Sequence, residues 1–212
     1  MENRGIEHLI HFTPAVNLLS IFAEGKLLSR ALLELPGAGR PTIEYFKFMD
    51  CIRFDDKKYI NLSVQHPNSS LFLRFRQKTA KDSHICWCVL KIDKKYVYQV
   101  DTLFSVTNAA NSHNRKNVGI TGDIKKFRMM FAKSLQVVTT HNSKIITRDS
   151  LKDKYPTDEQ AEVLVMGEIA AADILQVCFK NEQDLATGKA ALNDYDTSKF
   201  TVDASLFKKL RI

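Results

Sequence analysis

Several features that mark particular classes of protein are missing from this 212-residue chain. No apolar run reaches the length of about 18 residues that a transmembrane helix needs, so we expect no membrane partner. The N-terminal segment MENRGIEHLIHF lacks the apolar core of a signal peptide, which predicts a cytoplasmic protein. No linker rich in proline, glycine or serine and no internal repeat divides the chain, and this indicates one domain over residues 1–212.

Cysteines are few, and their spacing does not suggest a metal centre. Cys86 and Cys88 lie in the apolar segment HICWCVLKI, where a strand would place both on one face. A zinc site would need a second pair or histidines at ligand spacing, and neither is evident near Cys51 or Cys178. We therefore interpret the cysteines as buried free thiols in a reducing compartment, and we predict no bound metal.

Positive charge is in excess, with a net charge of +7 and a pI of about 9.2. Basic residues gather in RFRQKTAK, NRKN, KKFR and the C-terminal KKLR. Each cluster alone is typical of a solvated surface. Together with the excess charge, they favour a nucleic-acid partner.

The clearest predicted helix is TPAVNLLSIFAEGKLLS. Thr13 is a good N-cap, Pro14 suits the first helical position, and Gly25 suits a left-handed C-terminal cap. The predicted apolar stripe consists of Val16, Leu19, Phe22 and Ala23.

The remaining pattern predicts strands near residues 58–64, 85–92, 161–166 and 173–179, and a helix near 123–132. Strands do not alternate regularly with long helices, so a doubly wound parallel sheet is not expected. The pattern indicates an α+β protein.

Two polar groups stand out against this background. In HLIHFTPAVNLL, we place His11, Thr13 and Asn17 around a strand-to-helix junction, which suits a polar or anionic ligand. The alternative is a capping threonine, a core histidine and a surface asparagine, and the pattern alone favours that alternative.

The second group is in YPTDEQAEVLV. If this segment is a strand, Gln160 and Glu162 share a polar face, whereas the opposite face is wholly apolar. A protective charge on an edge strand would explain one glutamate well, but it explains the paired Gln and Glu less well.

These motifs are similar to those of the DarT family of toxins, which are ADP-ribosyltransferases that modify DNA bases using NAD. HFTPAVNL, from His11 to Leu18, resembles the family's HFTxxxNL, and QAEVLV, from Gln160 to Val165, resembles its QAExLV. The likeness runs from about His8 to Phe179. The segments RFDDKKYINLSVQHPNSSLF, TNAAN and GDIKKFRMMF resemble the guanine-modifying branch. Thymine-modifying members carry an FYF-like aromatic run where this chain has NLSV.

The resemblance implies a single-domain ADP-ribosyltransferase-like α+β fold, with a central split, mostly antiparallel sheet flanked by helices. It implies transfer of ADP-ribose from NAD to a base of single-stranded DNA, with guanine as the expected base and no metal. An antitoxin ADP-ribose hydrolase, a macrodomain or a related fold, is the implied partner. We expect a monomer.

The resemblance also assigns roles to residues. Glu162 becomes the catalytic glutamate, and His11, Thr13 and Asn17 become NAD contacts. Arg53 is the candidate for the catalytic or phosphate-binding arginine. These roles suit the chemistry, because a carboxylate opposes the positive charge that develops on the ribose and an arginine binds two pyrophosphate oxygens at once.

Three further residues are predicted to contact the nucleic acid. Arg74 and Arg76 would point the same way in an extended segment, and Gln160 would orient the incoming base. Two alternatives remain: an ADP-ribosyltransferase that acts on RNA or protein, and a non-catalytic nucleic-acid-binding module.

Overall fold

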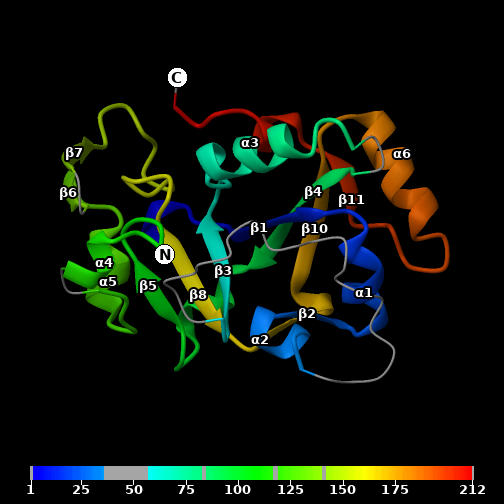
Figure 1. The fold of residues 1–212 in the computed structure, drawn as a ribbon, viewed down its shortest axis with the longest axis horizontal. Coiled ribbons are helices and arrows are strands. Elements are labelled where there is room, and N and C mark those ends of the chain that lie inside the picture. Colours follow the sequence, from blue (N-terminus) through cyan, green and yellow to red (C-terminus); the bar gives the residue numbers. More distant parts are fainter. Residues whose placement is uncertain (1, 36–56, 83–84, 117–118, 140–141, 212) are drawn as a thin grey trace.

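A seven-stranded sheet forms the centre of the computed structural model, which describes residues 2–35, 57–82, 85–116, 119–139 and 142–211 (Figure 1). From one edge to the other, it contains β11 (Phe200–Val202), β10 (Ile174–Phe179), β4 (Trp87–Asp93), β1 (His8–Pro14), β3 (Tyr59–Val64), β8 (Glu162–Met166) and β5 (Leu103–Ser105). All neighbouring strands are antiparallel except β10 and β11. The predicted α+β class with a mostly antiparallel sheet is therefore confirmed.

Helices and two small sheets surround this central sheet. The helices are α1 (Asn17–Ala23), α2 (Arg30–Leu33), α3 (Ser69–Lys78), α4 (His113–Lys116), α5 (Ile124–Met129) and α6 (Glu182–Ala191). The short 3₁₀ segments are η1 (Glu2–Arg4), η3 (Lys94–Tyr98), η4 (Ala171–Asp173) and η5 (Ala204–Phe207). The small sheets pair β2 (Lys26–Leu28) with β9 (Glu168–Ala170), and β6 (Ser134–Val138) with β7 (Ser143–Thr147).

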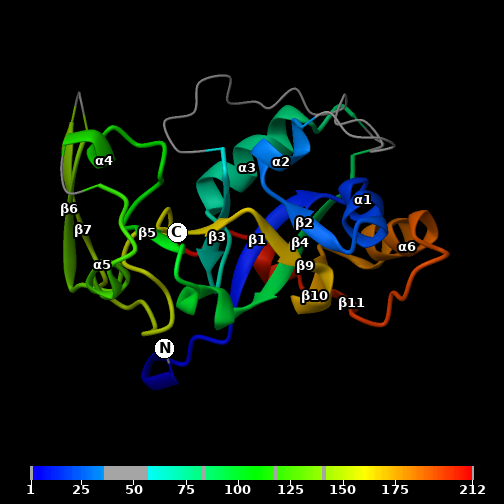
Figure 2. The ribbon, with the colours of Figure 1, turned by 90° about the horizontal axis from the view of Figure 1, so that it is seen from below.

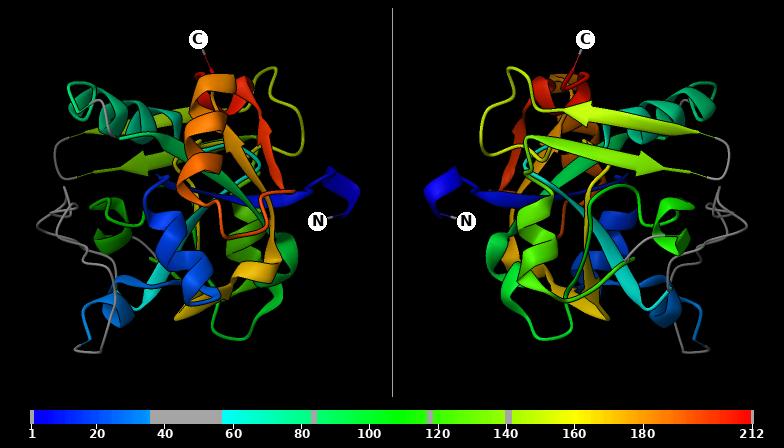
Figure 3. Two further views of the ribbon diagram at one scale, coloured as in Figure 1. Left: turned by 90° about the vertical axis from the view of Figure 1, so that its right-hand side faces the viewer. Right: turned by 90° about the vertical axis from the view of Figure 1, so that its left-hand side faces the viewer.

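The two ends of the molecule are built differently. Figures 1 and 2 place α1 and α6 at one end, and α4, α5 and the β6–β7 hairpin at the other. Figure 3 shows this hairpin from the side, and the C-terminal segment reaches it, because Arg211 donates to the backbone oxygen of Thr147 in β7 at 2.9 Å.

Apolar side chains pack on both faces of the sheet, because successive residues of a strand point to opposite faces. Leu9 of β1 joins the larger core, whereas its neighbour Ile10 joins a smaller cluster with Phe72 of α3 and Leu206 of η5. The smaller cluster attaches α3 and the C-terminal segment to one face of the sheet.

The two central strands β1 and β3 share few backbone pairs. β1 pairs with β4 at seven positions, from His8 to Pro14, but it pairs with β3 at only two, Leu9 with Val64 and Ile10 with Ser63. Beyond Ile10 the ladder between β1 and β3 ends. The residues that follow this point on β1 include the predicted His11 and Thr13.

The four strands predicted near residues 58–64, 85–92, 161–166 and 173–179 are confirmed as β3, β4, β8 and β10, and the helix predicted near residues 123–132 is α5. The N-terminal helix begins later than predicted. Pro14 is still paired with Trp87 in the ladder between β1 and β4, and α1 starts at Asn17 with Val16 as a cap that makes no side-chain hydrogen bond. Sheet pairing thus overrides a local sequence that suits a helix start.

The helix also buries a different face from the one predicted. Leu18 and Ile21 are buried, whereas Val16 and Leu19 are 49% and 37% exposed. The predicted C-terminal cap is confirmed, because Gly25 has a φ of +65°, which glycine adopts without strain.

Two of the thiols behave as predicted. Cys88 and Cys178 are buried and free, and burial raises the pKa of both, to about 11 for Cys178. Cys86 is free but only half-buried, and Cys51 lies outside the described residues. Across the described ranges, the structure contains no helix of the length and apolarity that crossing a membrane requires.

Candidate active site

The candidate site is built where β1 and β3 separate. His11 is the first residue of β1 beyond the ladder with β3, and its Nδ1 lies 3.2 Å from the backbone oxygen of Asn61. Because a carbonyl oxygen only accepts, Nδ1 carries the proton in this bond. Burial lowers the pKa of His11 below its usual value of 6.5, so the ring is neutral near pH 7 and its Nε2 is an acceptor.

Asn61 connects this histidine to the predicted catalytic glutamate. Its side-chain amide donates a hydrogen bond to Oε2 of Glu162 at 3.2 Å. The ladder between β3 and β8 pairs Asn61 with Leu164, so Asn61 and Glu162 lie on the same face of the sheet. One residue on β3 therefore contacts groups on both β1 and β8.

Glu162 is the first residue of β8, and its carboxylate accepts hydrogen bonds from three groups within the described part of the chain. Besides Asn61, the side-chain amide of Asn108 donates to Oε1 at 3.1 Å and the backbone N–H of Ala109 donates to Oε2 at 2.6 Å. The residue is only 6% exposed. A buried carboxylate without partners would be costly, so these donors stabilise its ionised form and fix its orientation.

This burial corrects the prediction of an exposed polar face. β8 lies between β3 and β5 in the sheet, and residues 162–165 are all buried. Gln160 does not belong to the strand, and its backbone N–H donates to Asp158 in the preceding turn. The two polar residues are thus not a matched pair along one strand, as the sequence suggested.

The loop that supplies Asn108 and Ala109 is itself braced. The side-chain amide of Asn114 donates to the backbone oxygens of both residues, at 2.9 and 3.1 Å, and Ser105 donates to the Asn114 side chain at 3.3 Å. These contacts hold the loop after β5 against the start of β8, so the two donors are preorganised around Glu162.

A second anchor fixes the turn that precedes Glu162. Ser69 and Ser70 begin α3, and their hydroxyls donate to the two carboxylate oxygens of Glu159 at 2.9 and 2.8 Å. The backbone oxygen of Thr157 in the same turn accepts a hydrogen bond from the C-terminal Arg211 at 2.8 Å. The turn is therefore tied to α3 and to the chain's last residues.

The remaining predicted NAD contacts lie close to each other. The side-chain amide of Asn17, at the start of α1, donates to Oγ1 of Thr13 at 2.8 Å. Thr13 is buried and lies on the same face of β1 as His11, two residues earlier. The structure thus groups His11, Thr13 and Asn17. Arg53 lies outside the described residues.

Arg74 and Arg76 do not form the pair that an extended segment would give. Both lie in α3, where residues two apart point in different directions. Arg74 is exposed, whereas Arg76 is half-buried and donates to the backbone oxygen of Phe207 at 3.0 Å. The helix forms because Asn68 caps it, accepting from the backbone N–H of Leu71.

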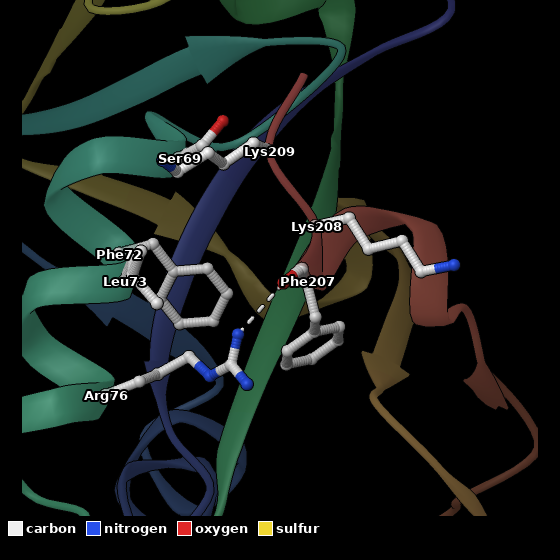
Figure 4. Close-up of a pocket in the computed structure, with 7 residues that line it drawn as sticks. All are labelled: Ser69, Phe72, Leu73, Arg76, Phe207, Lys208 and Lys209. Atoms are coloured by element: carbon white, nitrogen blue, oxygen red, sulfur yellow. Dashed lines mark hydrogen bonds between the residues drawn. The ribbon is translucent and has the colours of Figure 1, made fainter. Parts of the chain in front are cut away.

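A small cavity of about 120 Å³ lies beside Arg76, between α3 and the C-terminal segment (Figure 4). His11, Thr13 and Glu162 do not line it. Pockets that enclose whole small-molecule ligands usually measure about 300 Å³ or more. This cavity is therefore too small to take a dinucleotide.

A match to a family model decides the classification. The model describes an ssDNA thymidine ADP-ribosyltransferase, DarT, and it matches residues 10–207. The chain belongs to the DarT family. This confirms the predicted enzyme class, an NAD-dependent DNA ADP-ribosyltransferase, and the toxin family that the sequence motifs indicated.

Solved DarT structures share the fold at low sequence identity. Thermus sp. 2.9 DarT in complex with NAD+ is 14% identical, with a TM-score of 0.61 over 96% of this chain and 98% of that chain. The same Thermus protein with ADP-ribosylated ssDNA gives a TM-score of 0.58 at 14% identity, over 94% and 95%. Thermosipho africanus DarTG in complex with ADP-ribose gives 0.59 at 16% identity, over 95% of this chain and 51% of that chain. No curated protein matches.

Sequence reasoning missed two side chains of the candidate DarT site. Asn61 is the first residue of NLSV and Asn108 is part of TNAAN; both segments contributed to the family resemblance, but neither residue had a predicted role. Polar residues inside an otherwise apolar strand, as at Asn61, were the available signal. Over the described ranges, no group of histidine, cysteine or acidic residues is arranged to hold a metal ion.

Proposed function

We propose that residues 1–212 form one domain that transfers ADP-ribose from NAD to a base of single-stranded DNA and releases nicotinamide, with Glu162 as the catalytic carboxylate. The observation that carries this proposal is the geometry of Glu162, a buried carboxylate that accepts from Asn61, Asn108 and Ala109 among the described residues, beside the point where β1 and β3 separate. Membership of the DarT family supports the reaction class.

Glu162 would act on the ribose that links the two halves of NAD. As the bond between the ribose C1′ and the nicotinamide nitrogen breaks, nicotinamide leaves with the electron pair and positive charge grows on the sugar. A fixed carboxylate stabilises that charge. A nitrogen of the DNA base then bonds to C1′ on the opposite face. The base loses a proton, which Glu162 accepts and passes to solvent.

His11, Thr13 and Asn17 would bind NAD. The neutral His11 ring offers Nε2 as an acceptor, which suits an amide N–H or a ribose hydroxyl. The hydrogen bond between Asn17 and Thr13 fixes the threonine hydroxyl beside it. Arg53 would bind the pyrophosphate or assist the transfer, because a guanidinium binds two phosphate oxygens at once. Gln160 would orient the base.

Guanine is the target base that we propose. The segment NLSV begins with Asn61, which contacts Glu162, so the difference from the aromatic run of thymine-modifying members lies next to the catalytic carboxylate. An amide in place of an aromatic ring changes both the space and the hydrogen bonds available to the base at this position.

The biological role that we propose is that of a toxin restrained by a partner. An unrestrained enzyme would modify the host's own DNA, so an ADP-ribose hydrolase of the macrodomain or a related fold would be needed to reverse the damage. Expression of the active chain with and without such a hydrolase tests this. Growth arrest only in its absence is expected, and harmless high-level expression of an active enzyme would contradict the proposal.

Mass spectrometry of oligonucleotides after incubation with NAD tests the reaction and the base separately. Four single-stranded DNA oligonucleotides would each carry one kind of base at the centre of a common unreactive flank, with an RNA oligonucleotide of matching sequence and a protein mixture alongside. We expect one added ADP-ribose on the guanine oligonucleotide alone. Modification of thymine would overturn the choice of base, whereas modification of RNA or protein without DNA would overturn the substrate class.

A further inference from the structure

The cavity between α3 and the C-terminal segment combines aromatic and basic side chains. Phe72 and Arg76 reach it from α3, and Phe207, Lys208 and Lys209 reach it from the end of the chain. Figure 4 shows Arg76 pointing from the helix toward Phe207, while Lys208 extends away from the helix. Single-stranded nucleic acids are held by this combination, with bases on aromatic rings and phosphates on nearby cations.

Arg76 forms no direct ion pair with a carboxylate of the described residues, although Asp184 is close enough to act on its charge. Its guanidinium donates to a neutral backbone oxygen, and it lies 5.5 Å from the centre of the Phe72 ring and 5.4 Å from that of Phe207. Burial lowers its pKa, and the charge of Asp184 opposes this shift. A partly buried guanidinium whose hydrogen-bond and ring contacts are neutral is better satisfied when an anion or a base approaches it.

The cavity is joined by one contact to the turn before Glu162, and α3 also packs on β1. The Phe72 ring stacks on Phe12 of β1, whose side chain points to the opposite face from that of its neighbour His11, with 4.6 Å between ring centres. Ser69, which also lines the cavity, donates to Glu159 in the turn before Glu162. Glu162 shares its face of the sheet with Asn61, and Ser63, two residues further along β3, points to the same face. Ser63 pairs with Ile10, which packs against Phe72 of α3. Glu162 therefore faces the side of the sheet on which α3 packs.

From these observations, we propose that this cavity is a second DNA subsite, which holds one base of the substrate strand next to the base that reacts. The base lies against Phe207 and the guanidinium of Arg76, and Lys208 and Lys209 contact the phosphates on either side. The inference rests on the proposed activity on single-stranded DNA. The occupant is a base rather than NAD, because the volume of about 120 Å³ excludes a dinucleotide.

Photo-crosslinking tests the stacked base directly. An oligonucleotide that carries guanine with 5-iododeoxyuridine at successive flanking positions is irradiated with the full chain, and the crosslinked peptide is mapped by mass spectrometry. We expect a crosslink to Phe207 from one flanking position. Crosslinks that map only to other aromatic residues, at every position of the probe, would overturn the subsite.

Binding measurements with variants test the aromatic ring and the charges separately. Phe207→Leu keeps apolar packing but removes the ring, and we expect roughly 5- to 30-fold weaker binding of a fluorescent single-stranded oligonucleotide. The double variant Lys208→Gln with Lys209→Gln should lower the slope of log affinity against log salt by about 1.4, since each lost contact on a single strand removes about 0.7. Lys180→Gln with Lys189→Gln is the matched control, because both lysines are exposed, one just before α6 and one in its last turn.

The outcomes separate this inference from the proposed function. If the wild-type chain fails to modify single-stranded DNA, the proposed function fails and the subsite fails with it. If the wild-type chain modifies DNA but the double lysine variant matches the α6 control in affinity and slope, only the subsite is overturned. Lys208 and Lys209 are exposed, so the fold of this variant should survive, and an unchanged melting temperature verifies it.

Discussion

The side-chain amide of Asn61 donates a hydrogen bond to the carboxylate of Glu162 at 3.2 Å, across 101 residues of sequence. The backbone oxygen of the same residue accepts from His11 at 3.2 Å. Asn61 therefore ties the predicted NAD-binding histidine to the predicted catalytic glutamate. This position suits a residue that orients both groups.

Asn61→Ala should lower kcat by roughly 10- to 100-fold, because a hydrogen bond to a charged group contributes about 1.5–3 kcal/mol. KM for NAD should change much less, since the carboxylate acts chiefly on the charge of the transition state. Steady-state kinetics on a guanine oligonucleotide measures both constants. The matched control is Asn193→Ala, an exposed asparagine. A rise in KM with unchanged kcat would argue against a positioning role.

Glu162→Gln should reduce transfer by roughly 100- to 1000-fold, the usual effect of losing one preorganised electrostatic contact. The variant keeps the size of the side chain and loses its charge. With the amide oxygen in place of Oε2, Asn61 and Ala109 keep their acceptor and only Asn108 loses its own, so the fold should persist. Circular dichroism and the melting temperature verify folding. Near wild-type turnover by a folded variant would refute the mechanism.

The motif positions could be predicted from the sequence, but the carboxylate's surroundings could not. Glu162 and His11 stand in short local patterns that resemble a family signature. Asn108 and Ala109 contact Glu162 from 54 and 53 residues away, through a loop whose path depends on Asn114. Contacts of this kind depend on tertiary structure, which local periodicity does not encode.

The helix start at Thr13 was mispredicted for a related reason. Thr-Pro is a good local signal for a helix N-terminus. However, Thr13 pairs with Cys88 and Pro14 with Trp87, so the strand continues past the expected cap. The same extension places Thr13 on the face of β1 that carries His11, and it moves the helix start to Asn17, whose side chain then reaches Thr13.

Acid should destabilise the fold between about pH 6.5 and pH 4. Burial, followed by the charge of Lys91, lowers the pKa of His8 from 6.5 to about 4. In that window the unfolded chain binds more protons than the folded chain, so the free energy of unfolding falls as pH falls. His8→Gln removes this group and should flatten the pH dependence by about 1–3 kcal/mol across the window. Urea unfolding at a series of pH values measures it, and an identical pH dependence in the variant would contradict the assignment.

Gly188→Ala should lower the free energy of unfolding by about 1–3 kcal/mol, although alanine normally favours a helix. Gly188 is buried in α6, and a Cβ there would overlap the ring of Phe179 at the end of β10. The fully buried ring has little room to move. Gly188→Ala combined with Phe179→Leu should recover part of the loss relative to the single variants, and strict additivity of the two changes would argue against this contact.

NAD binding and DNA binding should respond to different substitutions. His11→Ala removes an acceptor beside Thr13 and should raise KM for NAD, while leaving the salt dependence of oligonucleotide affinity unchanged. Arg74 and Arg76 are two residues apart on α3, so their side chains point in different directions and are not expected to bind successive phosphates. Arg74 is exposed, whereas Arg76 is half-buried. Arg74→Gln should therefore lower the salt slope by at most about 0.7, the value for one contact on a single strand.

Titrations with NAD and oligonucleotide affinities measured at several salt concentrations test this division on the same protein samples. Arg76→Gln should weaken oligonucleotide binding and also lower the melting temperature, because its guanidinium bonds to the backbone of Phe207. Asn17→Ala, which frees the hydroxyl of Thr13 from its donor, should follow His11→Ala in the NAD titration. If His11→Ala flattens the salt slope while both arginine variants keep it, the NAD and DNA surfaces have been assigned the wrong way round.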